Sequence, residues 1–510
     1  MKVPFNEIGT LLLGLILSVI SAVICMQIMG QLGITPNTSL ISAVLVMVVA
    51  RVPLVVARRF RNLERQNYVL SIASAAGFAA ANCGFVAIAM FYIMGRTDML
   101  LPMAFGTLVG SVISVFVTGR LFDSKIYPAR GAWPLGAAVA NSLEAGDSGG
   151  KKGFQLLQGL AVGALASILG IPAAGVGIAF IANMVTMAAL AVGIVLRGYS
   201  TFFFRGFDIG DSYIAQGAMI GAGIVAFVQI FFSRGQAGTS SAEVEYTIDD
   251  KTASGRLLTS AVLFVVGAVV IALITGAFGE MGTVQSVLWV IFAGASAVVV
   301  MILVGTASMH SGWAPSFAVV TICLTIGVFA GFPPLALAVL VGYLGSIGPC
   351  LADTGIGLKA GWLLRGKGAD MEYEMYGRRQ QVYIKQVGVV IGIGVAVVFG
   401  TMLIRNDVLP PMSIFYASTI ETVVDAAVIR QLAIWAVPGA VLQLAFGNKS
   451  AGLMLAAGLL INNPIFGVTI LAALGVRRIV GDKHMGVRAP GIIAGDGLVG
   501  FVSNAWRVFF

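Results

Sequence analysis

Residues 8–29, IGTLLLGLILSVISAVICMQIM, form an apolar run without a charged side chain. A helix needs about 20 apolar residues to cross the hydrocarbon core of a bilayer, so this run is long enough to span it. The run is also longer than the roughly 7 to 15 apolar residues of a secretory signal peptide, and another apolar run follows it. We therefore expect a helix that stays in the membrane.

Similar runs recur along the 510 residues, of which 58% are hydrophobic and only 10% are charged. A soluble domain usually has about 25% charged residues. No polar block is large enough to fold by itself. The composition therefore predicts an all-α, polytopic membrane bundle with about 14 to 16 transmembrane helices.

The longest polar segment near the middle of the chain divides the sequence into parts of similar length. We predict an N-terminal transmembrane half at residues 1–232, a polar linker at 233–256 and a C-terminal transmembrane half at 257–510. A basic pair leads into a glycine-rich span in each half, as expected for a pseudo-symmetric internal repeat.

The net charge of +9 comes from basic residues that form short clusters between apolar runs, such as Arg58-Arg59-Phe60-Arg61. This is the positive-inside pattern. If that cluster faces the cytoplasm, the two spans before it place the N-terminus there too. We expect a multi-pass protein of the cell membrane, either inner or plasma membrane. We expect no nucleic-acid partner, because the sequence has no basic stripe with interleaved aromatic residues.

Many of the 65 glycines lie inside the apolar runs. Small residues four apart allow two helix backbones to approach closely in lipid. The sequence therefore predicts close helix contacts at six pairs, which are Gly106/Gly110, Gly159/Gly163, Gly217/Gly221, Gly327/Gly331, Gly388/Gly392 and Gly491/Gly495.

Proline, glycine and polar residues interrupt four apolar stretches, at 133–153, 306–315, 349–361 and 462–467. Irregular backbone at membrane depth persists only where protein buries it or water reaches it. We predict re-entrant segments or broken helices that line a cavity at these four places.

Charged residues near apolar runs need an explanation, because a charge at the bilayer centre costs about 2.5 to 3.5 kcal/mol. Asp353 and Lys359 lie in the glycine-rich segment 349–361. These opposite charges either pair with each other or coordinate a polar ligand. The alternative is that the segment is a loop at the membrane interface.

Two further carboxylates, Glu421 and Asp425, are four residues apart, so they share a face if the segment is helical. Their repulsion would raise the pKa of one of them, which then takes up a proton. The alternative is that Arg430 and solvent neutralise an interfacial helix. Asp496 lies beside glycines at the edge of a span, and its role is equally open.

Motifs of soluble enzymes are either isolated or absent. Residues 146–150, GDSGG, match the sequence around a serine-protease nucleophile, but the histidines, His310 and His484, both follow the serine. A chymotrypsin-like site needs the histidine base before it. We expect no catalytic site, no cofactor and no fixed metal site, and no ATPase motif is present. A membrane-embedded enzyme, or a channel or scaffold subunit, remains the alternative class.

Several stretches resemble the oligopeptide transporter (OPT) family, which includes the yellow stripe-like transporters. Their order and spacing agree with those of that family over most of the chain. The stretches are SIASAAGFAAAN at 71–82, WPLGAAVANSL at 133–143, DTGIGLKAGWL at 353–363 with QVG at 386–388, and GIIAGDGL at 491–498. Asn141 stands where glutamate is common, Gly357 where a second aspartate often stands, and Asp496 where glutamate is usual.

The resemblance implies a secondary active transporter that imports oligopeptides or metal chelates as a proton-coupled symporter. With the interrupted stretches, it leads to the hypothesis of alternating access around a cavity at the bilayer midplane. The expected substrate-binding residues are Trp133, Asn141, Asp147, Asp353 and Lys359. The candidates for proton coupling are Asp353, Glu421, Asp425 and Asp496. In this hypothesis Asn141 donates a hydrogen bond to the substrate, and Lys359 attracts a carboxylate or stabilises Asp353. Assembly into a homo-oligomer is left open.

Overall fold

The computed structural model describes residues 7–33, 38–51, 62–147, 151–181, 183–233, 247–311, 314–421, 426–446, 451–481, 485 and 488–509. Within these residues the chain is helical, and the one bridge between extended residues joins Phe122 and Tyr127. The prediction of an all-α, polytopic membrane bundle is confirmed. The basic cluster at 58–61 and Asp425 lie outside the described residues.

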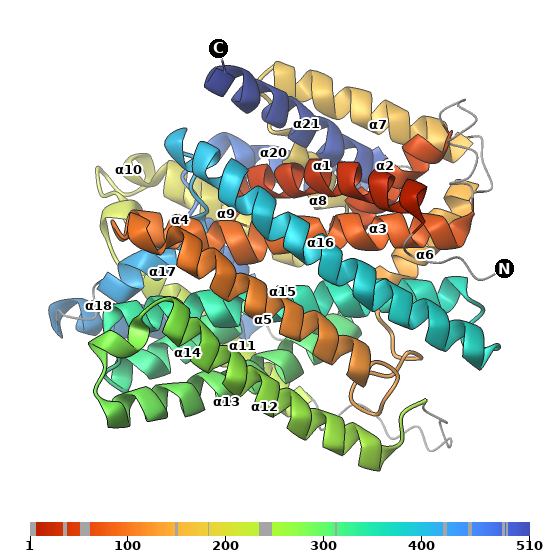
Figure 1. Ribbon diagram of the computed structural model, residues 1–510. Helices are drawn as coiled ribbons and strands as arrows, with labels where there is room; N and C mark the ends of the chain where they lie inside the picture. Colours follow the sequence, from red (N-terminus) through yellow and green to blue (C-terminus); the bar gives the residue numbers. More distant parts are fainter. Residues whose placement is uncertain are drawn as a thin grey trace.

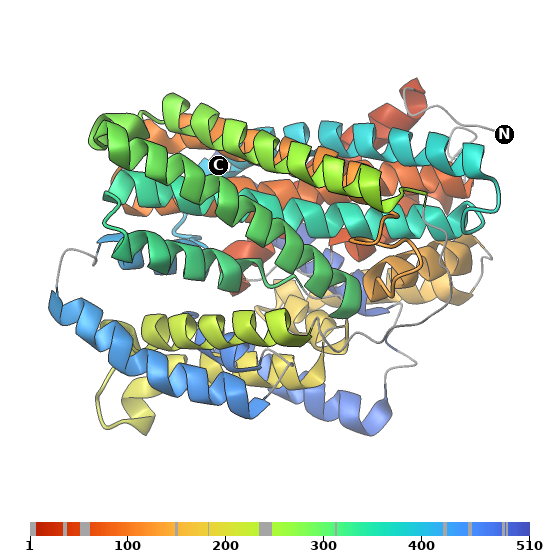
Figure 2. The same ribbon diagram turned by 90° about the horizontal axis from the view of Figure 1, so that it is seen from below.

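The helices form two bundles that lie side by side, as the view from below shows (Figure 2). The first, bundle A, contains the long helices that run in similar directions across Figure 1. Its helices are α1 (Ile8–Leu32), α2 (Thr38–Arg51), α3 (Leu63–Phe78), α4 (Val86–Ile93), α5 (Leu100–Leu121), α6 (Pro134–Asp147), α12 (Asp250–Ile274), α13 (Thr283–Ser311), α14 (Ser316–Phe329), α15 (Pro334–Leu364), α16 (Met371–Arg405) and α17 (Pro411–Glu421). A π-helical turn, Ala79–Phe85, joins α3 to α4 without a break.

The second, bundle B, is drawn mainly in yellow and dark blue in Figure 2. Its helices are α7 (Lys151–Ile168), α8 (Ala173–Ile181), α9 (Met184–Gly198), α10 (Ser200–Phe203), α11 (Ile214–Ser233), α18 (Ala426–Phe446), α19 (Ala451–Gly458), α20 (Pro464–Val480) and α21 (Arg488–Phe509). The two bundles meet where α11 packs on α14 and where α21 packs on α1.

Both predicted halves contribute to both bundles, and they do so in the same order. The first half supplies α1–α6 to bundle A and α7–α11 to bundle B, and the second half supplies α12–α17 and then α18–α21. The polar linker between the halves corresponds to the return of the chain from bundle B to bundle A. The boundaries at 1–232, 233–256 and 257–510 stay a prediction.

Seven helical stretches of the described residues are long and apolar enough to cross a membrane, and all seven belong to bundle A. They are Ile8–Gln31, Leu63–Ile93, Thr97–Leu121, Lys251–Ile274, Thr283–Met309, Pro334–Leu364 and Met371–Arg405. Shorter apolar helices include Leu157–Ile168, Met184–Gly198 and Ile214–Ala226 of bundle B. The predicted number of spans, about 14 to 16, stays a prediction.

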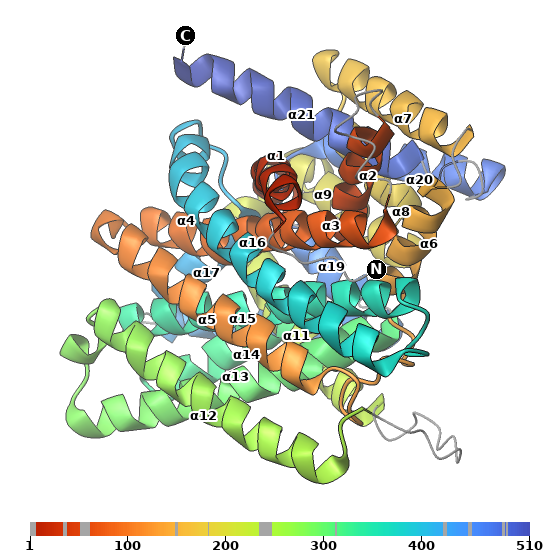
Figure 3. The same cartoon turned by 45° about the vertical axis from the view of Figure 1, so that its right-hand side comes forward.

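Glycines bring helix backbones into close contact, as predicted, at both members of three of the six pairs, Gly159/Gly163, Gly217/Gly221 and Gly388/Gly392. In bundle B, α7 lies along α21 (Figure 3), and a Cβ atom added at Gly163 would lie 2.1 Å from the carbonyl oxygen of Ile492. In bundle A, a Cβ atom at Gly392 would lie 2.4 Å from the carbonyl oxygen of Ala76. Gly331 is an exception, because it lies in a turn with φ +74° and has no neighbour within 4 Å of such a Cβ.

Three of the four stretches predicted to be broken contain helix ends, namely 133–153, 306–315 and 462–467. The fourth prediction is wrong, because α15 runs through 349–361 as a continuous helix with Pro349 inside it.

Side chains of α5 donate hydrogen bonds to α15 close to its proline. Pro349 lacks an N–H group, so the carbonyl group four residues earlier, that of Gly345, loses its helical hydrogen bond. The Ser114 hydroxyl donates to the carbonyl oxygen of Ile347 at 2.7 Å, and the Ser111 hydroxyl donates to that of Ser346 at 3.4 Å. Hydroxyl groups of adjacent helices can satisfy the carbonyl groups near a proline in this way.

The contact between α3 and α16 yields a prediction with a control two residues away. Gly392→Ala should destabilise the protein by about 1 to 3 kcal/mol, because the new methyl group meets backbone atoms of Ala76 that cannot move aside freely. Gly394→Ala should leave stability unchanged or raise it, because no atom lies within 4 Å of its Cβ position and alanine is the better helix former. Denaturant unfolding of both purified variants in detergent measures the difference. Equal effects would contradict the close approach of these helices.

Candidate functional site

An ion pair between α15 and α16 lies inside bundle A. Lys385 Nζ is 2.5 Å from Asp353 Oδ2, and both residues are almost completely buried. The Ser39 hydroxyl donates to Asp353 Oδ1 at 3.0 Å, and Lys385 Nζ also donates to Ser74 Oγ at 3.3 Å. A buried ion pair is tolerated when additional hydrogen bonds satisfy the remaining donors and acceptors of both side chains. Ser39 and Ser74 provide such bonds here.

The suggested pairing of Asp353 with Lys359 is wrong. The two residues are six positions apart on a continuous helix, so they point about 120° apart around its axis. Lys359 Nζ instead donates to the carbonyl oxygens of Ala129 and Gly131, at 2.8 and 3.0 Å. Its ammonium group also lies 4.6 Å from the centre of the Trp362 ring. Lys359 therefore attaches the connection between α5 and α6 to α15.

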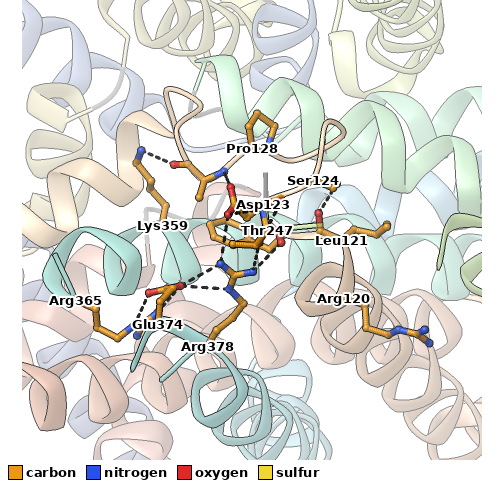
Figure 4. Close-up of polar contacts among 12 residues, drawn as sticks. Arg120, Leu121, Asp123, Ser124, Pro128, Thr247, Lys359, Arg365, Glu374 and Arg378 are labelled. Carbon is orange, nitrogen blue, oxygen red and sulfur yellow. Dashed lines mark hydrogen bonds and ion pairs between the residues drawn. The ribbon is translucent and has the colours of Figure 1, made fainter. Parts of the chain in front are cut away.

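A second charged cluster lies where α15 ends and α16 begins (Figure 4). Arg365 donates from Nε and NH2 to the two carboxylate oxygens of Glu374, at 2.7 and 3.2 Å. Arg378 Nε donates to the same carboxylate at 3.3 Å. All three side chains are buried. One glutamate thus holds two guanidinium groups from different helices.

Arg378 also holds two connecting segments, as Figure 4 shows. Its NH1 group donates to the carbonyl oxygen of Phe122 at 3.0 Å and to the Thr247 hydroxyl at 3.2 Å. Asp123 lies 3.7 Å from Arg378 NH2 and accepts from the backbone N–H groups of Ala129 and Thr247. Thr247 belongs to the segment that returns from bundle B. The attachment of this segment to bundle A therefore depends on Arg378.

Gln381 connects the charged cluster to the membrane interior. Its Oε1 accepts from Arg365 NH1 at 2.8 Å, and its Nε2 donates to the carbonyl oxygen of Gly357 at 3.0 Å and to Ser71 Oγ at 3.2 Å. The next polar residue along this face of α16 is Lys385, whose side chain crosses directly over Gly357. A row of polar side chains thus runs along α16 into the bundle.

A cavity of 360 Å³ opens beside the outer end of this row. Its lining comes from α3, the end of α15 and the start of α16. The lining residues are Asn62, Leu63, Glu64, Asn67, Leu364, Arg365 and Tyr373. Glu64 accepts hydrogen bonds from the hydroxyl groups of Tyr68, at 2.8 Å, and of Tyr373.

Two stretches that were predicted to line a cavity, 133–153 and 349–361, pack against each other here and enclose no described cavity. A Cβ atom added at Gly355 would lie 2.4 Å from the Trp133 ring, and one at Gly136 would lie 2.7 Å from Lys359 Cβ. Trp133 is fully buried, and its indole N–H donates to the carbonyl oxygen of Pro128 at 3.0 Å. α6 therefore packs tightly against α15 in this conformation. The described cavity lies elsewhere, at the end of α15.

The remaining predicted residues lie apart from this contact. Asn141 is exposed on α6, and Asp147 ends that helix, with its side chain outside the described residues. Glu421 is exposed at the end of α17. Asp496 is buried and accepts from the backbone N–H of Ala174 at 2.7 Å, so it caps the start of α8 in bundle B.

Sequence reasoning missed the polar row on α16. Its members Glu374, Arg378, Gln381 and Lys385 are spaced by four, three and four residues, which places them on one face of a helix. That spacing was the available signal. The segment 365–385 is rich in charged residues throughout, and this density obscures the helical spacing.

The pair in the membrane interior predicts non-additive effects of substitution. Lys385→Met and Asp353→Asn should each destabilise the protein by about 3 to 5 kcal/mol, because each leaves an uncompensated buried partner. The double variant should be destabilised by much less than the sum of the two. Denaturant unfolding of the four proteins in detergent measures the coupling. Lys251→Met, at an exposed position of α12, is the control and should change little. Additive effects would show that the two groups do not interact.

Comparison with known families places these observations in context. The family model described as OPT oligopeptide transporter protein matches residues 8–233. This range contains the stretches at 71–82 and 133–143, and the stretches at 353–363 and 491–498 lie beyond it. No curated protein matches the chain. The resemblance seen in the sequence motifs is thus confirmed for residues 8–233, which are similar to the oligopeptide transporter family.

Proposed function

We propose that this protein is a secondary active transporter that imports oligopeptides or peptide-like metal chelates through the cell membrane. The observation that carries the proposal is the family match over residues 8–233, on a chain whose long apolar helices carry buried charges. The family implies transport of oligopeptides across a membrane. Ionisable groups inside membrane helices commonly belong to substrate or ion pathways. Chelates, protons as the coupling ion and a cytoplasmic N-terminus are parts of the proposal.

Alternating access is the mechanism we infer, with bundle B moving relative to bundle A. Support comes from the order of the chain, because each half contributes its earlier helices to one bundle and its later helices to the other. Repeats in this arrangement are a usual basis for alternating access. The tight contact of α6 with α15 then belongs to a closed conformation. Trp133, Asn141, Asp147 and Lys359 would line the path once α6 moves away.

Proton coupling is assigned to Asp353 in this proposal. A proton on its carboxylate would remove the charge that holds Lys385, and the freed ammonium group would need a new partner. A substrate carboxylate is such a partner. Among the other candidates, Asp496 has a capping role at α8 and Glu421 is exposed, so Asp353 is the better placed carboxylate.

A comparison of two carboxylate variants tests this assignment. In proteoliposomes with an inward pH gradient, the wild-type protein should accumulate labelled di- to tetrapeptides above the external concentration. In the protein that remains folded, Asp353→Asn should lose this accumulation but retain exchange of internal for external peptide, because the carboxylate that takes up the coupling proton is absent. Glu421→Gln should behave like the wild type.

Three outcomes would change the proposal. Wild-type uptake that ignores the pH gradient would exclude proton coupling. Uptake driven by a sodium gradient would replace the coupling ion and leave the transporter intact. Loss of accumulation in Glu421→Gln alone would transfer the coupling role from Asp353 to Glu421.

The proposed role of Lys359 can be tested with a nearby lysine as control. Lys359→Met keeps much of the side-chain volume but loses the ammonium group that binds Ala129 and Gly131. We expect slower peptide uptake, because the position of α6 then becomes less defined. Lys367→Met, at an exposed turn residue, should keep the wild-type rate. A wild-type rate in Lys359→Met would remove this residue from the mechanism.

A further inference from the structure

One residue that lines the cavity beside Glu64 has a buried polar atom that no side chain or backbone group of the described residues satisfies. Asn67 lines the cavity and is only 1% exposed, yet its Oδ1 has no hydrogen-bond partner among them. A buried acceptor without a partner costs about 1 to 3 kcal/mol. Such an atom inside a cavity is therefore a place where a hydrogen-bond donor gains free energy on binding.

The charges around the cavity favour a cationic donor. Glu64 carries a carboxylate, and the described contacts to it come from the neutral hydroxyl groups of Tyr68 and Tyr373. Arg365 also lines the cavity, and its guanidinium group forms a two-point ion pair with Glu374, a carboxylate that it shares with Arg378. One negative charge in the immediate lining thus has no cation in direct contact among the described residues.

Two acceptors and a surplus negative charge match one chemical group closely. A primary ammonium group has three N–H donors and a compact positive charge. The carboxylate of Glu64 and the amide oxygen of Asn67 are separated by three positions on α3, so they lie on the same side of that helix. The volume of 360 Å³ is in the range of small-molecule sites, which are roughly 300 to 1,000 Å³.

The geometry points to this cavity as a binding site for the primary ammonium group of a ligand, with Glu64 and Asn67 as the recognition residues. This inference rests on the proposed function for the identity of the ligand, which is then a peptide with a free N-terminal amine. The site lies at the end of the polar row on α16. A bound ammonium group is therefore close to Arg365, which connects through Gln381 to the interior of the bundle.

The first experiment tests recognition of an amine without assuming transport. Thermal unfolding of the purified full-length protein in nanodiscs is followed in ethylammonium chloride, in sodium chloride of equal ionic strength and in ethanol. Ethylammonium should raise the unfolding temperature of the wild type, because a ligand that binds the folded state stabilises it. Sodium chloride and ethanol should have no such effect.

Two variants on neighbouring residues show whether the cavity is responsible. Asn67→Leu removes the unpartnered oxygen and should weaken the apparent affinity for ethylammonium by about tenfold or more, the usual result of losing a hydrogen bond to a charged group. Gln66→Leu is the matched control, because Gln66 Oε1 is also buried without a partner but does not line the cavity. Gln66→Leu should retain the wild-type affinity. Both variants should fold, because each replaces an unsatisfied polar group by an apolar one.

Equal affinities in the wild type and Asn67→Leu would overturn the assignment of Asn67. If ethylammonium chloride and sodium chloride raise the unfolding temperature equally, the effect is one of ionic strength, and the assignment of the binding site is wrong. Glu64→Gln removes the surplus charge and keeps the side-chain shape, so it should also lower the affinity for ethylammonium. Unchanged affinity in Glu64→Gln would show that the carboxylate does not recognise the cation.

A second experiment separates the fate of this site from that of the proposed function. Uptake and thermal stabilisation are compared for L-alanyl-L-alanine and N-acetyl-L-alanyl-L-alanine. The wild type should prefer the free amine, and Asn67→Leu should lose that preference. If the wild type shows equal uptake of both peptides and equal thermal stabilisation by them, the proposed ammonium site is wrong, although peptide transport stands. If neither is transported but ethylammonium still binds through Asn67, the proposed function is wrong and the site stands.

Discussion

A charge inside a bundle of apolar helices persists only if an opposite charge or several hydrogen bonds compensate it. This requirement determines how α16 packs in bundle A. Glu374 and Lys385 lie eleven residues apart on it, and each meets an opposite charge from outside that helix, Arg365 and Asp353 respectively. A rotation or shift of α16 by one residue would separate both pairs. The charged residues therefore define the register of α16 against α15.

Glycine contacts hold helices together in both bundles, and bundle A adds buried ion pairs and serine hydroxyl groups. In bundle B the contacts of α7 with α21 and of α11 with α18 depend on glycines, because a Cβ at Gly221 would lie 1.8 Å from the carbonyl oxygen of Ala436. In bundle A, Gly392 gives α16 a similarly close contact with Ala76 of α3. Contacts of this kind depend on shape and leave little room for larger side chains. The described cavity and the polar row both belong to bundle A, where charges and backbone approach together determine the packing.

Composition and periodicity were sufficient to predict the class of the fold, because hydrophobic length is a strict requirement of the bilayer. Three of the four interrupted stretches contain helix ends, as proline, glycine and polar residues suggested, and their lining of a cavity stays a prediction. Pro349 was misinterpreted because α15 continues through it while packed against α5, and no local sequence signal reports a neighbouring helix. The site was only partly predictable. Asp353 was singled out as a charge near an apolar run, but its partner is 32 residues away, and the nearer lysine lies on another side of α15.

The contact between Arg378 and Thr247 joins two distant parts of the structure. Thr247 is the first described residue after bundle B, and its hydroxyl and backbone N–H are bound by Arg378 and Asp123. Arg378 shares the carboxylate of Glu374 with Arg365, whose side chain forms part of the cavity wall. A continuous chain of polar contacts thus connects the start of the second half of the sequence to a chamber that Thr247 does not line.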